Sequence, residues 1–383
     1  MSFGGCSFRY SHQECRCPII HWTPAPRART LGAIPTTGDC AMPRKPDPAT
    51  LPVSLPRRRM LGAAAAAAAC GVPLTRAWAQ GDMAQGWPAR PLRVVVPYAP
   101  GNISDSSARV VCRHLGDRLG QQFFVENKSG ANTQIGTDLV ARAEPDGYTV
   151  LYTGPIITVM GPLFEKLGFD PMKELTPVSQ AIANPLVFLV RPDFPARDMR
   201  AFIAMTRKEP QKYFVASGGI GTMPHMAHEL LVSMAGMQSQ HVPYRGGSSW
   251  VSDFLGGQIT GIFDNPSSAI PLIKDGRARA LAVTSPARSA ALPDVPTVAE
   301  QGVPGFEVMN WFGFFAPSRT PAAVLDRLSA EIGKVMRLPE VSGEFGRIGV
   351  SSVGSSREKF GEIVAGDFRK WSSTIRERRI TPE

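Results

Sequence analysis

The chain has 383 residues, six cysteines and a formal net charge of +10 at pH 7. Residues 1–79 hold ten basic and three acidic residues, a net charge of +7, which leaves only +3 for residues 80–383 and argues against a nucleic-acid-binding body. Cys112 is the one cysteine beyond residue 79, so this later part has neither a disulfide pair nor a cysteine set for a zinc site.

The first 79 residues have the pattern of a leader. Residues 57–79 combine a basic start, an alanine-rich apolar stretch and the small-x-small ending Ala77-Trp78-Ala79, the three parts of a secretory signal peptide. Residues 1–41 show no periodic apolar pattern, so we expect them to be a doubtful extension, with translation starting near Met42. The sequence thus predicts a signal peptide over about 42–79 and a periplasmic location.

Other interpretations of this leader remain open. Arg57-Arg58-x-Met60-Leu61 resembles a twin-arginine export signal, although Pro56 stands where Ser or Thr is usual. Cys70 follows two alanines as at a lipoprotein cleavage site, but Ala67 replaces the expected Leu and disfavours an anchor there. The alanine run can also be a buried helix, and it is too short to span a bilayer.

From residue 87 onward, short β-rich runs alternate with helical stretches. Strands are expected at 92–96, 123–125 and 148–152, and helices at 105–119 and 135–143. This order and spacing predict parallel pairing with right-handed crossovers. The chain then loosens through Gly161-Pro162 and Asp170-Pro171 before the next strand.

A second α/β set follows. Strands are expected at 185–190, 213–216, 240–243, 259–263 and 278–284, helices at 223–235 and 248–255, and after a segment at 311–315 further helices at 322–336 and 358–376. The two sets predict an α/β fold of two lobes, each a mainly parallel sheet flanked by helices, with a ligand cleft between them. We expect lobe 1 to comprise 87–185 plus 312–383, and lobe 2 to comprise 186–311.

Three turns that precede helices are candidates for touching a ligand. In the turn 97–105, Ser104 or Asp105 can cap the helix, and the free N–H groups of its first turn can take a carboxylate. The turn 127–134 is dense in small polar residues. The turn 217–222 has three glycines that permit close backbone approach, but it lacks the Lys-Ser/Thr ending of a P-loop. Each turn is also compatible with an ordinary strand–helix connection.

Catalytic and metal signatures are weak. His225, His228 and Glu229 share one helix face, but His-x-x-His-Glu is not a known zinc-protease motif, and helix capping, surface exposure or ligand contact is the favoured role. No Gly-x-Ser-x-Gly elbow occurs, and nothing in the spacing of Ser, His and Asp nominates a nucleophile. Asp264 and Asn265 end an apolar strand, where they can line the cleft or merely start the turn into Pro266.

Nine short segments carry a resemblance to a known family, in order and without large gaps between about residue 87 and about residue 340. They are residues 87–98, 125–131, 145–149, 241–246, 254–258, 263–265, 279–284, 292–300 and 311–313. Together they resemble the Bug-type solute receptors of tripartite tricarboxylate transporters.

The resemblance implies a type II periplasmic binding protein that has no cofactor, closes over one small organic acid and delivers it to a membrane permease. It also implies that the turn 97–105 wraps one carboxylate through main-chain N–H groups, while 130–136 and 217–225 complete the pocket. Paired glycines are usual in the family where this chain has Asn102 and Ile103. A Gly-Gly-Asn segment is usual where it has 132–134, so the identity of the ligand is left open.

These observations predict a monomeric solute receptor for a carboxylate-bearing metabolite, with no catalytic residue and no metal. Its partners are expected to be the organic acid and the permease subunits. Two alternatives are a sensory receptor that presents its ligand to a signalling partner, and an exported hydrolase using Ser217 or His225. The residues expected to line the cleft are Tyr98, Asn102, Ser104, Gln134, Thr153, Ser217, Thr222, His225 and Asp264.

Overall fold

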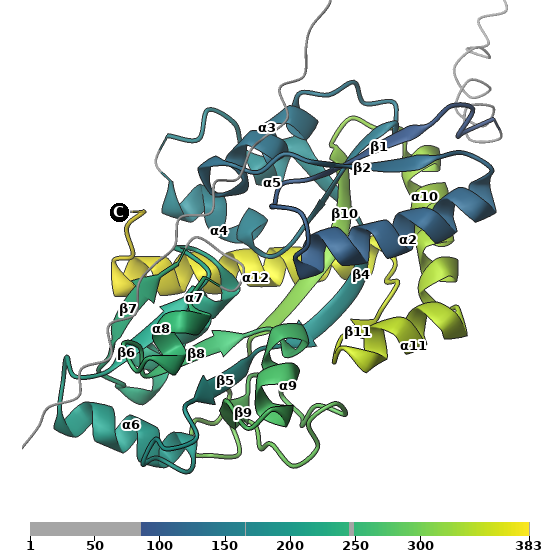
Figure 1. Cartoon of the computed structure of the whole chain (residues 1–383). Helices are drawn as coiled ribbons and strands as arrows, with labels where there is room; N and C mark the ends of the chain where they lie inside the picture. Colours follow the sequence, from purple (N-terminus) through teal and green to yellow (C-terminus); the bar gives the residue numbers. More distant parts are fainter. Residues whose placement is uncertain (1–85, 165, 245–248, 383) are drawn as a thin grey trace, which may run out of the picture. The chain divides into compact units, whose positions relative to one another are not determined.

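A computed structural model describes residues 86–382 apart from Glu165 and residues 245–248 (Figure 1). All described residues belong to one compact unit, Val72–Glu383. The predicted signal peptide and the doubtful extension lie outside the described residues. Within the described part of the chain, no helix is both long enough and apolar enough to cross a membrane.

The first sheet, on which lobe 1 is built, has six strands in the order β11-β4-β10-β3-β1-β2. Their bounds are β1 Leu92–Val96, β2 Phe123–Asn127, β3 Thr149–Thr153, β4 Leu175–Pro185, β10 Met309–Pro317 and β11 Ser351–Ser352. The strand β1 lies between β2 and β3 and pairs with both in parallel, as expected of strand–helix–strand units.

The second sheet, on which lobe 2 is built, has five strands in the order β7-β6-β8-β5-β9. Their bounds are β5 Val187–Val190, β6 Phe214–Ser217, β7 Gln240–Pro243, β8 Gly261–Asp264 and β9 Arg279–Val283. The strand β6 pairs in parallel with β7 and β8. The two-lobed α/β class is therefore confirmed, while the exact residue bounds of the lobes stay a prediction.

The expectation of mainly parallel sheets is wrong, because both sheets are mixed. The long strand β10 is antiparallel to β3 and β4, and β5 is antiparallel to β8 and β9. The reason is the route of the chain between the sheets. It leaves the first sheet along β4, passes through Leu186 directly into β5, and returns along β10. Strands used for these passages do not belong to strand–helix–strand units, so the rule that makes such units parallel does not govern them.

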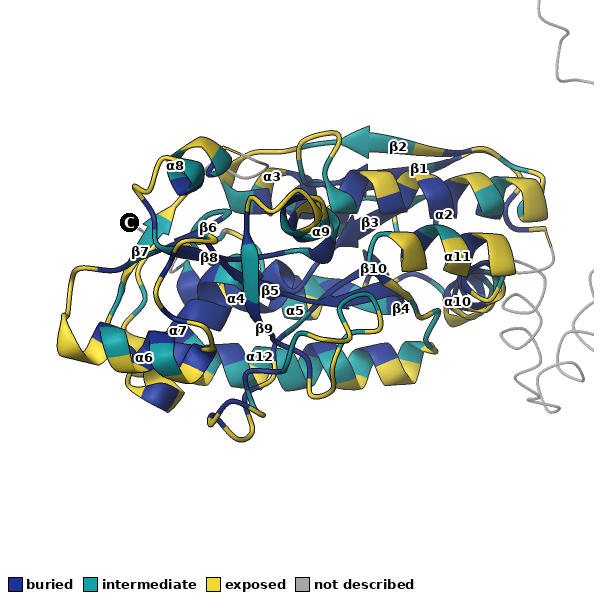
Figure 2. Ribbon diagram, turned by 60° about the horizontal axis from the view of Figure 1, so that its bottom comes forward, coloured by how far each residue is buried: buried dark blue, intermediate teal, exposed yellow. Residues whose placement is uncertain are grey.

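Helices cover both faces of each sheet, and Figure 2 shows that their buried residues face inward. One face of the first sheet shares a core with α2 Ile103–Leu119, α10 Ala322–Met336 and α11 Pro339–Arg347. The other face packs on α3 Gln134–Ala141, α5 Pro171–Glu174 and the start of α12 Arg357–Arg378. The second sheet is covered by α6 Met199–Lys208 and α7 Met223–Ala235 on one face, and by α8 Val251–Leu255 and α9 Pro266–Lys274 on the other.

Two features tie the lobes together away from the strand-end turns. The helix α12 runs past both cores (Figure 1): Phe360 packs under the first sheet, whereas Trp371 belongs to the core of lobe 2. At the strand passages, the buried Thr284 hydroxyl accepts from the N–H of Leu186 at 2.8 Å and donates to the carbonyl of Val308 at 2.6 Å. Thr284 therefore joins the outgoing and the returning chain.

Several elements were missed because they contain prolines. The stretch around Gly161-Pro162 and Asp170-Pro171, expected to be loose, in fact holds α4 Ile156–Leu163, α5 and the whole of β4. Pro177 lies in β4 where the pairing with β10 shifts register, and such an irregularity tolerates a residue without an N–H. The helix α9 begins at Pro266, a favoured first position, and also contains Pro271.

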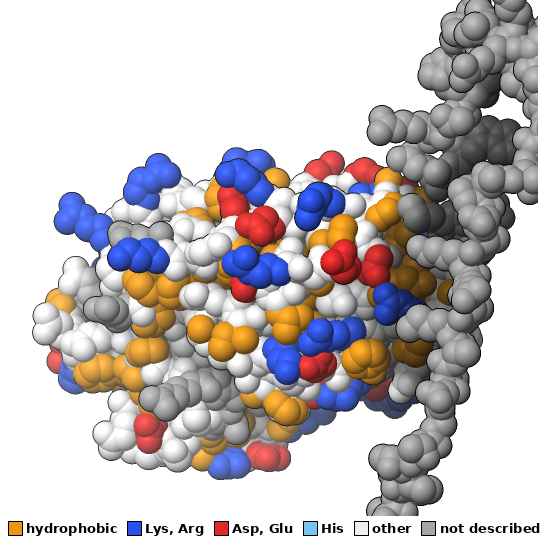
Figure 3. Space-filling model, turned by 90° about the horizontal axis from the view of Figure 1, so that it is seen from above, with side chains coloured by type: hydrophobic (Ala, Val, Ile, Leu, Met, Phe, Trp, Pro, Cys, Tyr) orange, Lys and Arg blue, Asp and Glu red, His pale blue; other side chains and the backbone are white. Residues whose placement is uncertain are grey.

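The face seen in Figure 3 carries basic and acidic side chains interspersed with apolar ones. Many charged side chains pair with a neighbour of opposite sign, as Arg93 does with Glu126 and Arg142 with Asp138. Pairs this exposed contribute little to stability, typically less than about 1 kcal/mol each.

Candidate ligand-binding cleft

A cavity of ≈ 540 Å³ lies between strand-end turns of the two lobes. Its lining comes from the turn before α3, from Phe164 after α4, from the turns after β6 and β7, and from the C-terminal segment. The lining residues are Ala131, Asn132, Gln134, Phe164, Ile220, Pro243, Tyr244 and Pro382. None of these has a charged side chain, so an anion in the cavity would meet dipoles and N–H groups.

The first turn folds around Asn102. The Asn102 side chain caps α2 by accepting from the N–H of Asp105 at 3.0 Å, and it also accepts from the Ser104 hydroxyl. The expected caps, Ser104 and Asp105, are therefore wrong, and α2 begins at Ile103, two residues before its predicted start. Asn was overlooked as a cap because Ser104 and Asp105 lay nearer the expected helix start; Asn is an equally strong N-cap residue.

Asp105 turns back into the same loop. Its carboxylate accepts from the N–H of Gly101 at 2.9 Å and from the side chains of Arg109 and Asn127. Burial alone would raise the pKa of Asp105, but these hydrogen bonds lower it overall, so the carboxylate is ionised. One N–H group of the turn is thus bonded by the protein itself. Within the described chain no acceptor lies on the N–H groups of Ile103 and Ser104, the first two of α2.

Tyr98 and Thr153 lie together at the carboxyl ends of β1 and β3. The Tyr98 hydroxyl is 3.3 Å from the Thr153 hydroxyl and accepts from the N–H of Gly154 at 3.3 Å. The Tyr98 ring meets Phe312 edge-on with centroids 5.9 Å apart. Burial raises the pKa of Tyr98, so its phenol is neutral and can donate a hydrogen bond.

The second turn has an unusual backbone. Ala131, Asn132 and Thr133 all have positive φ angles of 43°, 53° and 73°, a left-handed conformation that Ala and Thr rarely adopt. Gln134 follows as the first residue of α3 and faces the cavity. The Asn132 amide donates to the carbonyl of Ile220, in the turn after β6, at 2.8 Å.

The third turn brings Ser217, Thr222 and His225 together. Ser217 Oγ accepts from the N–H of Gly219 at 3.1 Å, and the Thr222 hydroxyl donates to the carbonyl of Gly219 at 2.7 Å. His225 Nδ1 accepts from the N–H of Gly221 at 3.0 Å. The N–H groups of this turn are therefore largely used to shape it.

His241, which was not predicted as a site residue, completes this cluster. Its Nε2 is 2.6 Å from Ser217 Oγ, and its ring stacks on His225 with centroids 3.8 Å apart. A serine nucleophile needs such a histidine, but also a group that orients the histidine. In the described residues no acceptor lies on Nδ1 of His241, and Ser217 is fully buried. The contact between Ser217 and His241 is better suited to holding the turn 217–222 in place than to catalysis.

His225 and His241 are held neutral. Burial lowers the pKa of His225 to about 4 and that of His241 to about 3. The neighbouring Glu229 is ionised: burial opposes this, but hydrogen bonds from His228 and Arg378 bring its pKa to about 2. His228 is bonded on both nitrogens, to Glu229 and to Ser239. No group suited to hold a metal ion occurs among the described residues.

Within the described chain, Asp264 makes no hydrogen bond to the other eight predicted residues, and it belongs to a separate polar cluster at the passages between the sheets. Its Oδ1 accepts from the N–H of Asn265, while its buried Oδ2 has no partner in the described chain. Burial raises its pKa to about 6. Beside it, the Asn265 side chain accepts from Asn184 and Asn310. We therefore assign Asp264 to the polar cluster between the sheets rather than to the turn into Pro266.

Of the nine predicted residues, only Gln134 lines the cavity directly. Apart from Asp264, the others form three local groups: Tyr98 with Thr153, Asn102 with Ser104, and Ser217 with Thr222 and His225. Asn132, Ile220 and Tyr244 were missed. Asn132 had a sequence signal, because it stands where a glycine is usual. Ile220 lines the cavity, and its own carbonyl accepts from the Asn132 amide. Residue type reveals neither fact.

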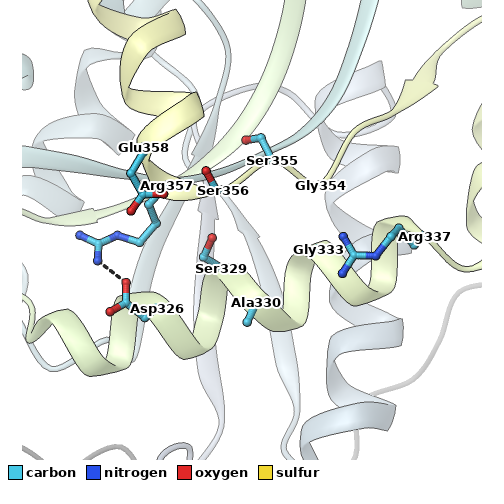
Figure 4. A pocket seen from close by; sticks show the side chains of 10 residues that line it. All are labelled: Asp326, Ser329, Ala330, Gly333, Arg337, Gly354, Ser355, Ser356, Arg357 and Glu358. Carbon is cyan, nitrogen blue, oxygen red and sulfur yellow. Dashed lines mark hydrogen bonds and ion pairs between the residues drawn. The ribbon is translucent and has the colours of Figure 1, made fainter.

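A second cavity, of ≈ 320 Å³, lies between α10 and the N-terminus of α12 (Figure 4). Its charges are largely satisfied internally. Arg357 pairs with Asp326 at 2.5 Å, and the carboxylate of Glu358 interacts with its own backbone N–H and with Ser356, which lowers its pKa. With two arginines and two carboxylates in its lining, this cavity selects neither sign of charge.

A family model and several known proteins are similar to this chain. The model of the tripartite tricarboxylate transporter family receptor (TctC) matches residues 107–380. The protein BugT of Bordetella pertussis is 32% identical over 297 residues, which cover 77% of this chain and 91% of BugT.

Two similar solved structures contain a ligand. An R. palustris protein solved with adipate is 30% identical, with a TM-score of 0.71 over 78% of this chain and 100% of that one. MatC from Rhodopseudomonas palustris, with bound malate, is 28% identical, with a TM-score of 0.68 over 76% of this chain and 100% of MatC.

Proposed function

Because this chain belongs to the receptor family of the tripartite tricarboxylate transporters, we propose that it binds a small carboxylate-bearing metabolite in the periplasm and delivers it to the permease subunits of such a transporter. The receptor acts as a monomer, without cofactor or catalytic step, and reaches the periplasm by means of its leader. Adipate and malate, present in the two R. palustris structures, are both dicarboxylates. A short dicarboxylate is therefore the proposed ligand class.

The observation that carries this proposal is the cavity between the two lobes, whose lining residues in the described part of the chain carry no charge. It is bordered by the turn that starts α3 and by Ile220, two residues before the N-cap of α7. Helix N-termini attract anions through their free N–H groups and the helix dipole, and both terms strengthen when closure removes water. Two carboxylates at the two ends of one ligand suit a cavity that has a turn of each lobe on either side.

A thermal-shift screen of mono-, di- and tricarboxylates tests the proposal. A ligand that binds only the native state stabilises it by about 2.7 kcal/mol at a hundredfold excess over Kd, a shift of several degrees. We expect a short dicarboxylate to raise the melting temperature and its neutral diamide to leave it unchanged.

Equal shifts by acid and diamide, or no shift by any carboxylate, would contradict a carboxylate receptor. Turnover of ester substrates that is lost in Ser217→Ala would instead support the exported hydrolase. Capture of a signalling protein rather than permease subunits by the ligand-loaded receptor would support the sensory alternative, which uses the same cleft.

A further inference from the structure

The turn Ala131–Thr133 is held in a conformation that its residues do not favour. Three consecutive residues without glycine have left-handed φ angles, and of these only Asn132 adopts that region with any ease. Such strained segments persist where the surroundings hold them, and they concentrate at functional sites.

The strained turn Ala131–Thr133 directs the Asn132 amide toward lobe 2. Asn132 Nδ2 donates to the carbonyl of Ile220 at 2.8 Å, which joins the turn after β2 to the turn after β6 across 88 positions of sequence. Both residues line the cavity, so the hydrogen bond lies at its wall. Asn132 is half-buried, and the bond is partly shielded from water.

The receiving turn packs closely against α4, whose residues Val159 and Leu163 share the core of lobe 2, and against Asn132 from the turn before α3. Gly221 has a φ of +78°, and a Cβ atom added there would lie 2.8 Å from Leu163 and 3.3 Å from Val159, both on α4. The same position would be 3.6 Å from the Asn132 amide nitrogen. Figure 1 shows α4 beside the end of lobe 2 that contains α7. The approach is too tight for a side chain at residue 221, so the backbone carbonyl of Ile220 comes within reach of Asn132.

We propose that Asn132 is a positioning residue: its hydrogen bond to Ile220 forms only when the lobes are closed, and it sets how long a bound ligand is retained. This inference rests on the proposed receptor function. An interaction made only in the closed state shifts the population toward that state, and the apparent affinity rises with the closed fraction. Other links between the lobes, at Thr284 and along α12, lie at the strand passages and beside α7, whereas this one borders the cavity.

The test compares Asn132→Asp and Asn132→Gly in the full chain. Asn132→Asp keeps the shape but replaces the donor by a carboxylate that repels the Ile220 carbonyl. Asn132→Gly removes the side chain and suits the left-handed backbone, so it carries the test if the Asp variant fails to fold. Gln240→Glu, an equivalent amide-to-acid change on an exposed residue of β7, is the matched control.

The first readout needs no ligand. Hydrogen–deuterium exchange is followed in peptides covering 127–137 and 217–226. We expect both Asn132 variants to raise exchange in the distant 217–226 peptide about five- to tenfold, the effect of losing one hydrogen bond between neutral groups. The Gln240→Glu control should exchange like the wild type.

The second readout is the affinity for adipate and malate by calorimetry, with an expected five- to tenfold increase in Kd for either acid that the wild type binds. Wild-type exchange in 217–226 for both Asn132 variants would overturn the positioning role whether or not these acids bind. Unchanged affinity in variants with raised exchange would overturn its role in retention. If neither acid binds the wild type while exchange rises as expected, the ligand class is wrong and the link between the lobes stands.

Discussion

The buried His225 stacks on the half-buried His241 at the end of lobe 2 that faces the cavity. Their rings are 3.8 Å apart and nearly parallel, and burial keeps both neutral by lowering their pKa values to about 4 and about 3. A neutral His225 can accept from the N–H of Gly221, whereas a protonated ring cannot. The shape of the turn 217–222 therefore depends on the protonation state of this pair.

This dependence predicts a loss of stability in acid. Between pH 6.5 and about 4, the unfolded chain takes up a proton at His225 that the native state refuses, so the free energy of unfolding falls as the pH falls. A shift of this size corresponds to about 3 kcal/mol. We expect His225→Gln to lose that part of the pH dependence, measured by urea unfolding at pH 7 and pH 4.5.

His114→Gln on α2 is the control, because it removes a histidine outside the cluster. The interpretation is rejected if His225→Gln loses as much stability between the two pH values as the wild type. His241 and Glu229 keep their own contributions in the variant, so a reduced slope, and not its disappearance, is the expected result.

Among the elements, α2 shows how a single side chain decides where a helix begins. Asn102 adopts an extended backbone and accepts from the N–H of Asp105, while Asp105 reaches back to the N–H of Gly101. Together they satisfy one free donor of the first helical turn, the N–H of Asp105, and one donor of the preceding turn, the N–H of Gly101. The N–H groups of Ile103 and Ser104 have no acceptor within the described chain, so they are free to bind solvent or a ligand.

Replacing this cap should destabilise the ligand-free protein. We expect Asn102→Ala to lower the free energy of unfolding by about 1 kcal/mol, the usual cost of losing an Asn N-cap. Chemical denaturation measures the change. Ser106→Ala, which removes an exposed hydroxyl bonded to carbonyls of the same turn, should cost less. Equal losses in the two variants would contradict the capping role of Asn102.

At the scale of the whole molecule, the two lobes are joined by strands that pass straight from one sheet to the other. Thr284 lies at these passages and is fully buried. Its backbone also bonds Leu186 and Val308, so four hydrogen bonds meet at one residue. Such a junction holds the two passages in register.

The Thr284 hydroxyl is therefore expected to matter for global stability. Thr284→Val keeps the shape but leaves the N–H of Leu186 and the carbonyl of Val308 buried without this partner, at a cost of about 2 to 4 kcal/mol. Thr320→Val is the matched control, since the buried hydroxyl of Thr320 has no partner in the described chain. A loss at Thr284 no larger than that at Thr320, both by chemical denaturation, would contradict this assignment.

Elements with a continuous local pattern were predictable. The strand β1 and the helices α7 and α10 have the predicted bounds, because apolar runs and apolar residues at 3–4-residue spacing are local signals. The strand β4 and the helix α9 were missed, since prolines that normally break elements are tolerated at a register shift and at a first helical turn. Tertiary pairing outweighed the local signal in both.

In the candidate site too, local features were predictable from the sequence and contacts set by packing were not. Small polar residues ahead of helices marked the three turns, because capping and close approach depend on residue type near one point of the chain. The stacking of His241 on His225, the inward turn of Asp105 and the bond from Asn132 to Ile220 join residues 16 positions apart, 4 apart within a turn, and 88 apart. Their side-chain directions follow from packing.

From its amino acids alone, this protein could be assigned an α/β fold of two lobes, a receptor family and three candidate ligand turns, because periodicity, turn chemistry and motif order are properties of short segments. Tertiary structure decided the mixed direction of the sheets, the N-cap of α2 and the contact between the lobes at Asn132. These depend on how distant strands cross and pack, and a pattern confined to neighbouring residues carries no information about that.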